Sequence, residues 1–172
     1  MSDRFAHKLR LDQIRDGERL DLVADDAERD AIAKRLGLPS LSRLEAHVTL
    51  ARTGEVIRVS GRLGAALEQC CAITNEPVPE HVDEAFELVF MPEPPVSAPD
   101  EEIELGASEL DVIFHDGAAI DLGGAIADTL ALSLDPYPRS AGADAAIKEA
   151  GVLTEEQASP FAVLAKLRKD EA

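Results

Sequence analysis

"LSRLEAHVTLAR", residues 41–52, alternates apolar and polar side chains, and so does "VIRVSGRLGAALEQCC", residues 56–71. This period of two is typical of strands with one buried face and one wet face. Thr53-Gly54-Glu55 predicts a hairpin turn between them, and a third alternating stretch, residues 80–90, follows a turn at residues 74–77. We expect residues 41–90 to form an antiparallel meander. Its expected core-facing residues are Leu44, Ala46, Val48, Leu50, Ile57, Val59, Gly61, Leu63, Ala65, Leu67, Val82, Phe86, Leu88 and Phe90.

The flanking segments predict further short elements. Residues 4–12 alternate and predict one strand, with Phe5, His7, Leu9 and Leu11 on one face. Helices are predicted over residues 25–37, which end at a glycine, and over residues 144–151. Another helix is expected to begin at Asp121 and to end before Pro136, with an apolar stripe of Leu122, Ile126, Leu130 and Leu134. A short strand is predicted at residues 110–115, after a mobile, Pro- and acid-rich loop at residues 91–109.

Together these elements predict a single α+β domain, residues 1–158, in which a few short helices pack on an antiparallel sheet. Residues 159–172 form a separate amphipathic tail, whose Ser-Pro start predicts a helix. The tail either docks on its own domain or binds a groove of another protein. The residues that would contact a partner are Phe161, Leu164 and Leu167, with the basic Lys166 and Arg168.

The charge is distributed unevenly. The formal net charge is −17, and residues 63–138 contain 17 acidic side chains and no Lys or Arg. This acidic middle should repel a phosphate backbone and attract basic partners, although it could equally serve solubility alone. No apolar run approaches the roughly 20 residues of a membrane span. The first residues lack the apolar segment of a signal peptide, so we expect a cytoplasmic protein.

A few basic residues could form an RNA-binding strip. Arg4, Lys8 and Arg10 share one face of the predicted N-terminal strand, and Arg58 and Arg62 share the polar face of a later strand. If these strands are neighbours, the five side chains could contact RNA phosphates. The alternative is a pair of ordinary solvated strand faces.

The sequence contains no recognisable catalytic, metal-binding or cofactor-binding motif. Cys70 and Cys71 are adjacent, so in a strand they point to opposite faces and cannot bind one ion together. We expect Cys71 to be buried with the apolar face and Cys70 to be incidental. The carboxylates show no paired acid–base signature, and no glycine-rich phosphate loop is present. We therefore expect no catalytic residue, metal site, cofactor or small-molecule substrate.

The chain nevertheless resembles the bacterial YceD family of large ribosomal RNA subunit accumulation proteins, as a cysteine-poor member. The resemblance rests on Leu67–Pro77, on "AIDLGGAIADTLALSLDP" (Ala119–Pro136), on "DPYPR" with "AGA", and on "PFAVLAKLRK" (Pro160–Lys169). Many relatives read Cys-x-x-Cys-x-x-Pro at the turn, where this chain has Cys71, Thr74 and Pro77. The other matching positions are Asp121, Leu122 and Pro136.

The resemblance implies a non-enzymatic factor for large-subunit ribosomal RNA accumulation or processing, and hence for ribosome biogenesis. Its expected partners are a ribosomal RNA precursor or a basic ribosomal or assembly protein. Two alternatives stay open: an RNA-processing enzyme with clustered carboxylates and a divalent metal, and an acidic module that binds a basic protein unrelated to ribosomes.

Overall fold

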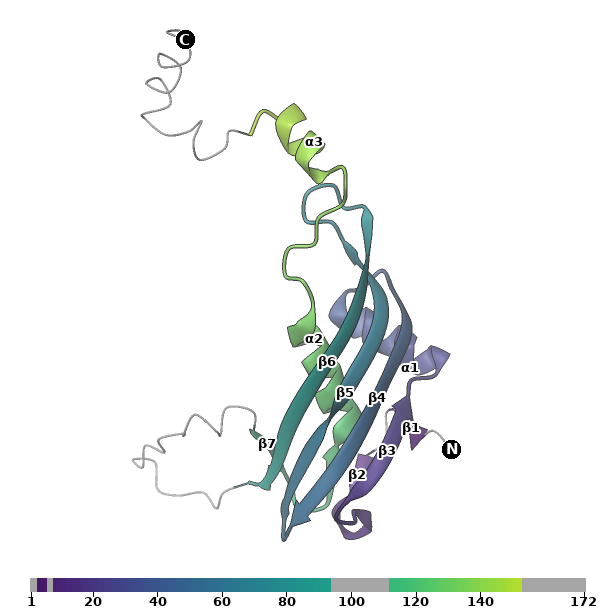
Figure 1. The fold of residues 1–172 in the computed structure, drawn as a ribbon, viewed down its shortest axis with the longest axis vertical. Coiled ribbons are helices and arrows are strands. Elements are labelled where there is room, and N and C mark those ends of the chain that lie inside the picture. The colour runs from purple at the N-terminus through teal and green to yellow at the C-terminus, as the bar shows by residue number, and fades with distance from the viewer. Residues whose placement is uncertain (1–2, 6–7, 94–111, 153–172) are drawn as a thin grey trace, which may run out of the picture. The chain divides into compact units, whose positions relative to one another are not determined.

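The computed structural model describes residues 3–5, 8–93 and 112–152, which form an α+β fold (Figure 1). The chain divides into two compact units, Met1–Gln69 with Pro79–Pro136, and Cys70–Val78 with Tyr137–Ala172. The main sheet has the strand order β1-β3-β4-β5-β6-β7, and β2 and β8 form a small second sheet. The strands are β1 (Asp3–Arg4), β2 (Lys8–Arg10), β3 (Glu18–Val23), β4 (Ser40–Thr53), β5 (Val56–Cys70), β6 (Pro77–Pro92), β7 (Val112–His115) and β8 (Ala119–Asp121).

The predicted meander is confirmed as β4, β5 and β6, three long strands that are neighbours in the sheet. β4 and β5 pair antiparallel, with Val48 opposite Gly61 and Leu50 opposite Val59. The two-residue turn between them needs a left-handed residue, which Gly54 supplies with a φ of 65°. β5 and β6 run antiparallel because six residues are too few for a parallel crossover.

The core of the larger unit lies between one face of this sheet and two helices, α1 (Asp26–Leu36) and α2 (Leu122–Ser133). Asp25 begins α1 with a capping box to Glu28, and Gly37 ends it in the left-handed conformation. The side chain of Asp121 caps α2 by accepting a hydrogen bond from the backbone N–H of Gly124 at 2.9 Å. The apolar stripe of α2 then packs into the core, where Leu122, Ile126 and Leu130 are buried.

The N-terminal prediction is wrong in one respect. Residues 4–12 do not form one strand: β1 pairs in parallel with β3, whereas β2 pairs with β8 and is followed by a 3-10 turn at Leu11–Gln13. Two strands, β3 and β8, were not expected from the sequence. β3 is the more important, because it pairs along its whole length with β4 and extends the sheet beyond the meander.

The remaining predictions concern the strand and loop after the meander, the third helix and the C-terminal tail. The strand predicted at residues 110–115 is present as β7, and the short third helix is present as α3 (Ala143–Glu149). The acidic loop was predicted to start at residue 91, but β6 continues to Pro92. The rest of that loop, from residue 94, and the tail of residues 159–172 lie outside the described residues, so both stay predictions, as does the domain boundary at residue 158.

Candidate binding surfaces

The structure does not assemble the predicted basic strip in one sheet. Lys8 and Arg10 lie on β2 in the small sheet, whereas Arg58 and Arg62 lie on β5 in the middle of the main sheet. Arg4 belongs to the edge strand β1. The two predicted strands are therefore not neighbours, and the five side chains do not form one strip. Phosphate contacts stay a prediction for the residues of β1, β2 and β5 separately.

The outer face of the sheet, which points away from α1 and α2, carries charges that neutralise one another. Nη1 of Arg58 lies 2.7 Å from Oε1 of Glu87 on the neighbouring strand. Arg62 donates two hydrogen bonds to Asp83, from Nε at 2.5 Å and from Nη2 at 3.0 Å. These bonds are the main reason that the pKa of Asp83 lies below its usual value. Arginines engaged in this way offer little free charge to a phosphate backbone.

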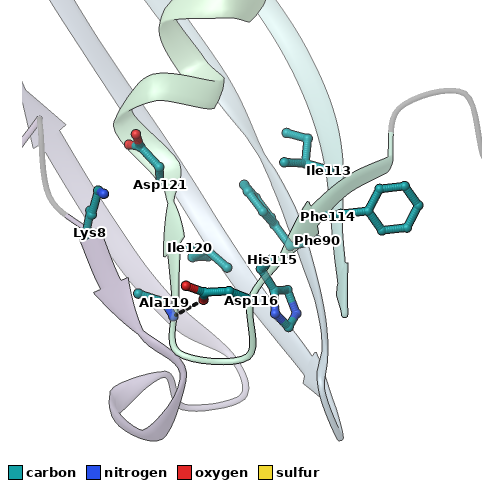
Figure 2. Close-up of a pocket in the computed structure, with 9 residues that line it drawn as sticks. All are labelled: Lys8, Phe90, Ile113, Phe114, His115, Asp116, Ala119, Ile120 and Asp121. Carbon is teal, nitrogen blue, oxygen red and sulfur yellow. Dashed lines mark hydrogen bonds between the residues drawn. The ribbon is translucent and has the colours of Figure 1, made fainter. Parts of the chain in front are cut away.

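A cavity of about 320 Å³ lies beside β7 and β8 in the larger unit (Figure 2). Phe90, Ile113 and Ile120 supply much of its apolar lining, and its polar lining comes from Lys8, His115, Asp116 and Asp121. The size is at the lower limit of ordinary small-molecule sites.

Three of the polar side chains of this cavity, those of His115, Asp116 and Asp121, form hydrogen bonds with the backbone. Asp116 accepts hydrogen bonds from the backbone N–H groups of Ala118 and Ala119, and these bonds lower the pKa of its carboxyl group. His115 contacts the carbonyl of Glu55 through Nε2 and accepts from the N–H of Gly117 through Nδ1, which indicates the neutral tautomer protonated at Nε2. The side chains of His115 and Asp116 therefore hold the loop between β7 and β8 in place. They leave few free polar groups for binding a ligand.

The smaller unit contains a polar niche around Cys71, which is buried, as predicted, while Cys70 is exposed. Sγ of Cys71 accepts hydrogen bonds from the backbone N–H groups of Ser140 at 3.2 Å and Thr74 at 3.4 Å. The hydroxyl groups of Thr74 and Ser140 lie 3.0 Å apart, and both donate to Oε2 of Glu76, at 2.9 and 2.8 Å. Four polar side chains thus converge at the predicted turn, although only Cys71 was expected to be buried there.

The niche favours negative charge. Burial acts to raise the pKa of the Cys71 thiol, but hydrogen bonds from Thr74 and Ser140 outweigh it and lower the pKa from 9.0 to about 6. Hydrogen bonds from the same two hydroxyl groups lower the pKa of Glu76, and the bond from Ser140 has the larger effect. Each hydroxyl has a single hydrogen, so the thiolate and the carboxylate compete for it.

Sequence reasoning identified Cys71 and Thr74 but missed Glu76 and Ser140. Glu76 lies inside the predicted turn and is one of many acidic residues, so nothing in its spacing distinguishes it. Ser140 comes into contact with the turn from 64 residues further along the chain than Glu76, and a single sequence does not reveal such a contact.

The described residues contain no group of three or more His, Cys, Asp or Glu side chains placed to hold a metal ion. In the same part of the chain, none of the helices has the length and apolar character needed to cross a membrane. The tail residues from Phe161 to Arg168, which were predicted to contact a partner, lie outside the described residues.

Comparisons with known proteins gave one match. The model of the family described as "Large ribosomal RNA subunit accumulation protein YceD" matches residues 59–168, well over half of the chain. The matched region begins within β5 and includes both the Cys71 turn and α2. No curated protein and no solved structure matched. The chain therefore belongs to the YceD family.

Proposed function

We propose that this protein is a non-enzymatic factor that supports the accumulation or processing of large-subunit ribosomal RNA during ribosome biogenesis. The observation that carries the proposal is the family match over residues 59–168, because the family is named for accumulation of this RNA and not for a reaction. The proposed role in ribosome assembly carries with it a proposed cytoplasmic location.

Contact with a basic ribosomal or assembly protein is the mode of action that the surface supports best. The chain carries 17 acidic residues and no Lys or Arg between residues 63 and 138, a field that attracts basic proteins and repels nucleic acid. The two arginines on β5 are engaged by Asp83 and Glu87, which further reduces free positive charge on the sheet. Precursor RNA would then be contacted mainly through the protein partner.

Depletion of the protein in its own cells tests the proposal. We expect the ratio of large-subunit to small-subunit ribosomal RNA to fall, and we expect the tagged protein to sediment with large-subunit precursors. The small-subunit RNA serves as the internal control for general growth effects. An unchanged ratio, together with a protein that never sediments with precursors, would contradict the proposal and favour an acidic module for some other basic protein.

A further inference from the structure

One long strand of the main sheet has an edge that is largely unpaired. β6 lies between β5 and β7, but β7 pairs only with Val89–Pro92 at the end of β6 (Figure 1). Within residues 3–5, 8–93 and 112–152, no other strand pairs with this side of β6. Residues 81–88 of β6 are called the free edge below. At about 3.3 Å per residue they extend roughly 26 Å, the length of an ordinary added strand.

The backbone of the free edge is available for hydrogen bonding. Along any strand, alternate residues direct their N–H and C=O groups to opposite sides, so half of these groups point away from β5. Among the residues that the structure describes, none of the backbone hydrogen bonds outside the regular ladders involves residues 81–88. Such a row of donors and acceptors is a template on which another chain can pair.

The side chains of the free edge also leave room for a partner. Asp83, Glu84 and Ala85 are exposed although they are consecutive, so both faces of the strand are open to solvent at this point. Pro79 stands just before the free edge. Proline has no backbone N–H to donate to a neighbouring strand, so within sheets it occurs mainly on edge strands.

The charge of the free edge selects the partner. It carries Asp83, Glu84 and Glu87 and no Lys or Arg. Glu84 forms no ion pair with any described residue. Asp83 and Glu87, in contrast, each form an ion pair with an arginine of β5. A second copy of the same edge would bring acidic side chains against acidic side chains, which is unfavourable directly across a strand pair. An extended segment rich in Lys and Arg would instead meet opposite charge.

We propose that the free edge of β6 binds a Lys- and Arg-rich segment of a partner protein, which adds to the sheet as a further strand. The backbone ladder supplies affinity in this mode of recognition, and the flanking side chains supply specificity. The inference rests on the proposed function in one respect, namely that the partner is a basic ribosomal or assembly protein.

A synthetic twelve-residue peptide that alternates Lys with Val or Thr is the probe. Amide hydrogen exchange of the full chain, resolved by residue with NMR, is measured with and without the peptide. We expect slower exchange at alternate residues of the free edge, because only outward N–H groups gain a bond. Protection elsewhere, protection without the period of two, or equal protection by a peptide with Glu in place of Lys would overturn the proposal.

A matched pair of charge variants separates the edge from the overall field. We expect Glu84→Lys to weaken peptide binding about fivefold, the scale of one exposed charge pair lost and one repulsion gained. Asp30→Lys makes the same change of charge on α1, where the side chain is exposed, and should leave the affinity within about twofold. Equal effects of the two variants would mean that the peptide responds only to net charge, against the proposal.

Proline scanning tests the backbone contact directly. Glu84→Pro and Ala85→Pro remove N–H groups that point in opposite directions, so one of them breaks the β5–β6 ladder and the other removes an outward donor. The thermal midpoint identifies the variant that keeps the fold, and we expect that variant to lose the periodic protection. Unchanged protection in the folded variant would contradict strand addition.

The proposed function and this inference can fail separately. Cells that carry Glu84→Lys should show the lower ratio of large-subunit ribosomal RNA seen on depletion. A normal ratio in these cells, with a low ratio on depletion, would overturn the edge site and leave the function intact. A normal ratio in both, with periodic protection by the peptide, would support the edge site and contradict the ribosomal role.

Discussion

The sulfur of Cys71 is held by N–H groups of two separate segments, so its ionisation should be visible in solution. We expect the ultraviolet absorbance of a thiolate to appear with a midpoint near pH 6, because hydrogen bonds from Thr74 and Ser140 lower the pKa of this thiol to about 6. Cys71→Ser should abolish the transition and Cys70→Ser should preserve it. Ser140→Ala, which removes one hydroxyl donor, should move the midpoint upward. A single transition near pH 9 in the unchanged protein would contradict this environment.

The same residue should make folding depend on pH. The pKa of Cys71 is lower in the folded chain than its ordinary value of 9.0, so the folded state loses this proton first. The resulting stabilisation is complete above pH 9, falls as the pH drops towards 6, and is lost below that. We expect the free energy of unfolding in urea to differ more between the unchanged protein and Cys71→Ala at pH 9 than at pH 6. An equal difference would show that the niche does not favour the thiolate.

The niche brings together side chains of two segments that substitution could convert into metal ligands. The hydroxyl of Thr74 lies beside that of Ser140 and the carboxylate of Glu76. We expect the double variant Thr74→Cys, Ser140→Cys to retain about one zinc ion per chain, since three thiolates and a carboxylate make a four-ligand set. Atomic absorption of the dialysed protein measures it. The single variant Thr74→Cys is the control, and zinc in neither protein would contradict the expected convergence.

At the scale of single elements, two glycines of β5 provide a matched test of the packing. A Cβ atom at Gly61 would lie 2.4 Å from the backbone oxygen of His47 and 2.9 Å from Cγ1 of Val48, which is too close. At Gly64 the nearest atom would be Cγ of Glu45 at 3.5 Å, an ordinary contact. We expect Gly61→Ala to lower the free energy of unfolding in urea by about 2 kcal/mol. Gly64→Ala should change it by less than about 0.5 kcal/mol. Equal effects would contradict the β4–β5 register.

The elements that could be predicted are those in which local pattern and burial agree. β4, β5 and β6 alternate over many residues, and most of their large apolar side chains face one core, so a period of two was sufficient to find them. α1 and α2 were found from their acidic caps and terminal signals.

The elements that could not be predicted depend on distant partners. β8 has three residues, and β3 mixes Leu20 and Leu22 with charged neighbours, so neither carries a strong local signal. β1 and β2 share one alternating stretch but pair with strands in different sheets. The same limit applies to the candidate sites. Ser140 matters because it contacts a distant turn, and the free edge of β6 is defined by the lack of a pairing strand in the part of the chain that the structure describes.

At the scale of the whole molecule, the charge of −17 and its concentration in residues 63–138 should govern how the proposed basic partner is bound. Long-range attraction of this kind accelerates association and is screened within about 10 Å at 0.1 M salt. Strand addition, in contrast, depends on backbone hydrogen bonds that salt screens little. The two contributions can therefore be separated by ionic strength.

We expect proteins released from large ribosomal subunits to associate with this chain more slowly as salt is raised, while the dissociation rate changes much less. Electrostatic steering acts mainly on the association rate, and a ladder of backbone bonds acts mainly on the dissociation rate. Surface plasmon resonance with the immobilised full chain measures both rates, and sucrose at matched viscosity controls for slower diffusion. A dissociation rate that rises with salt as steeply as the association rate falls would indicate that surface charge alone holds the partner.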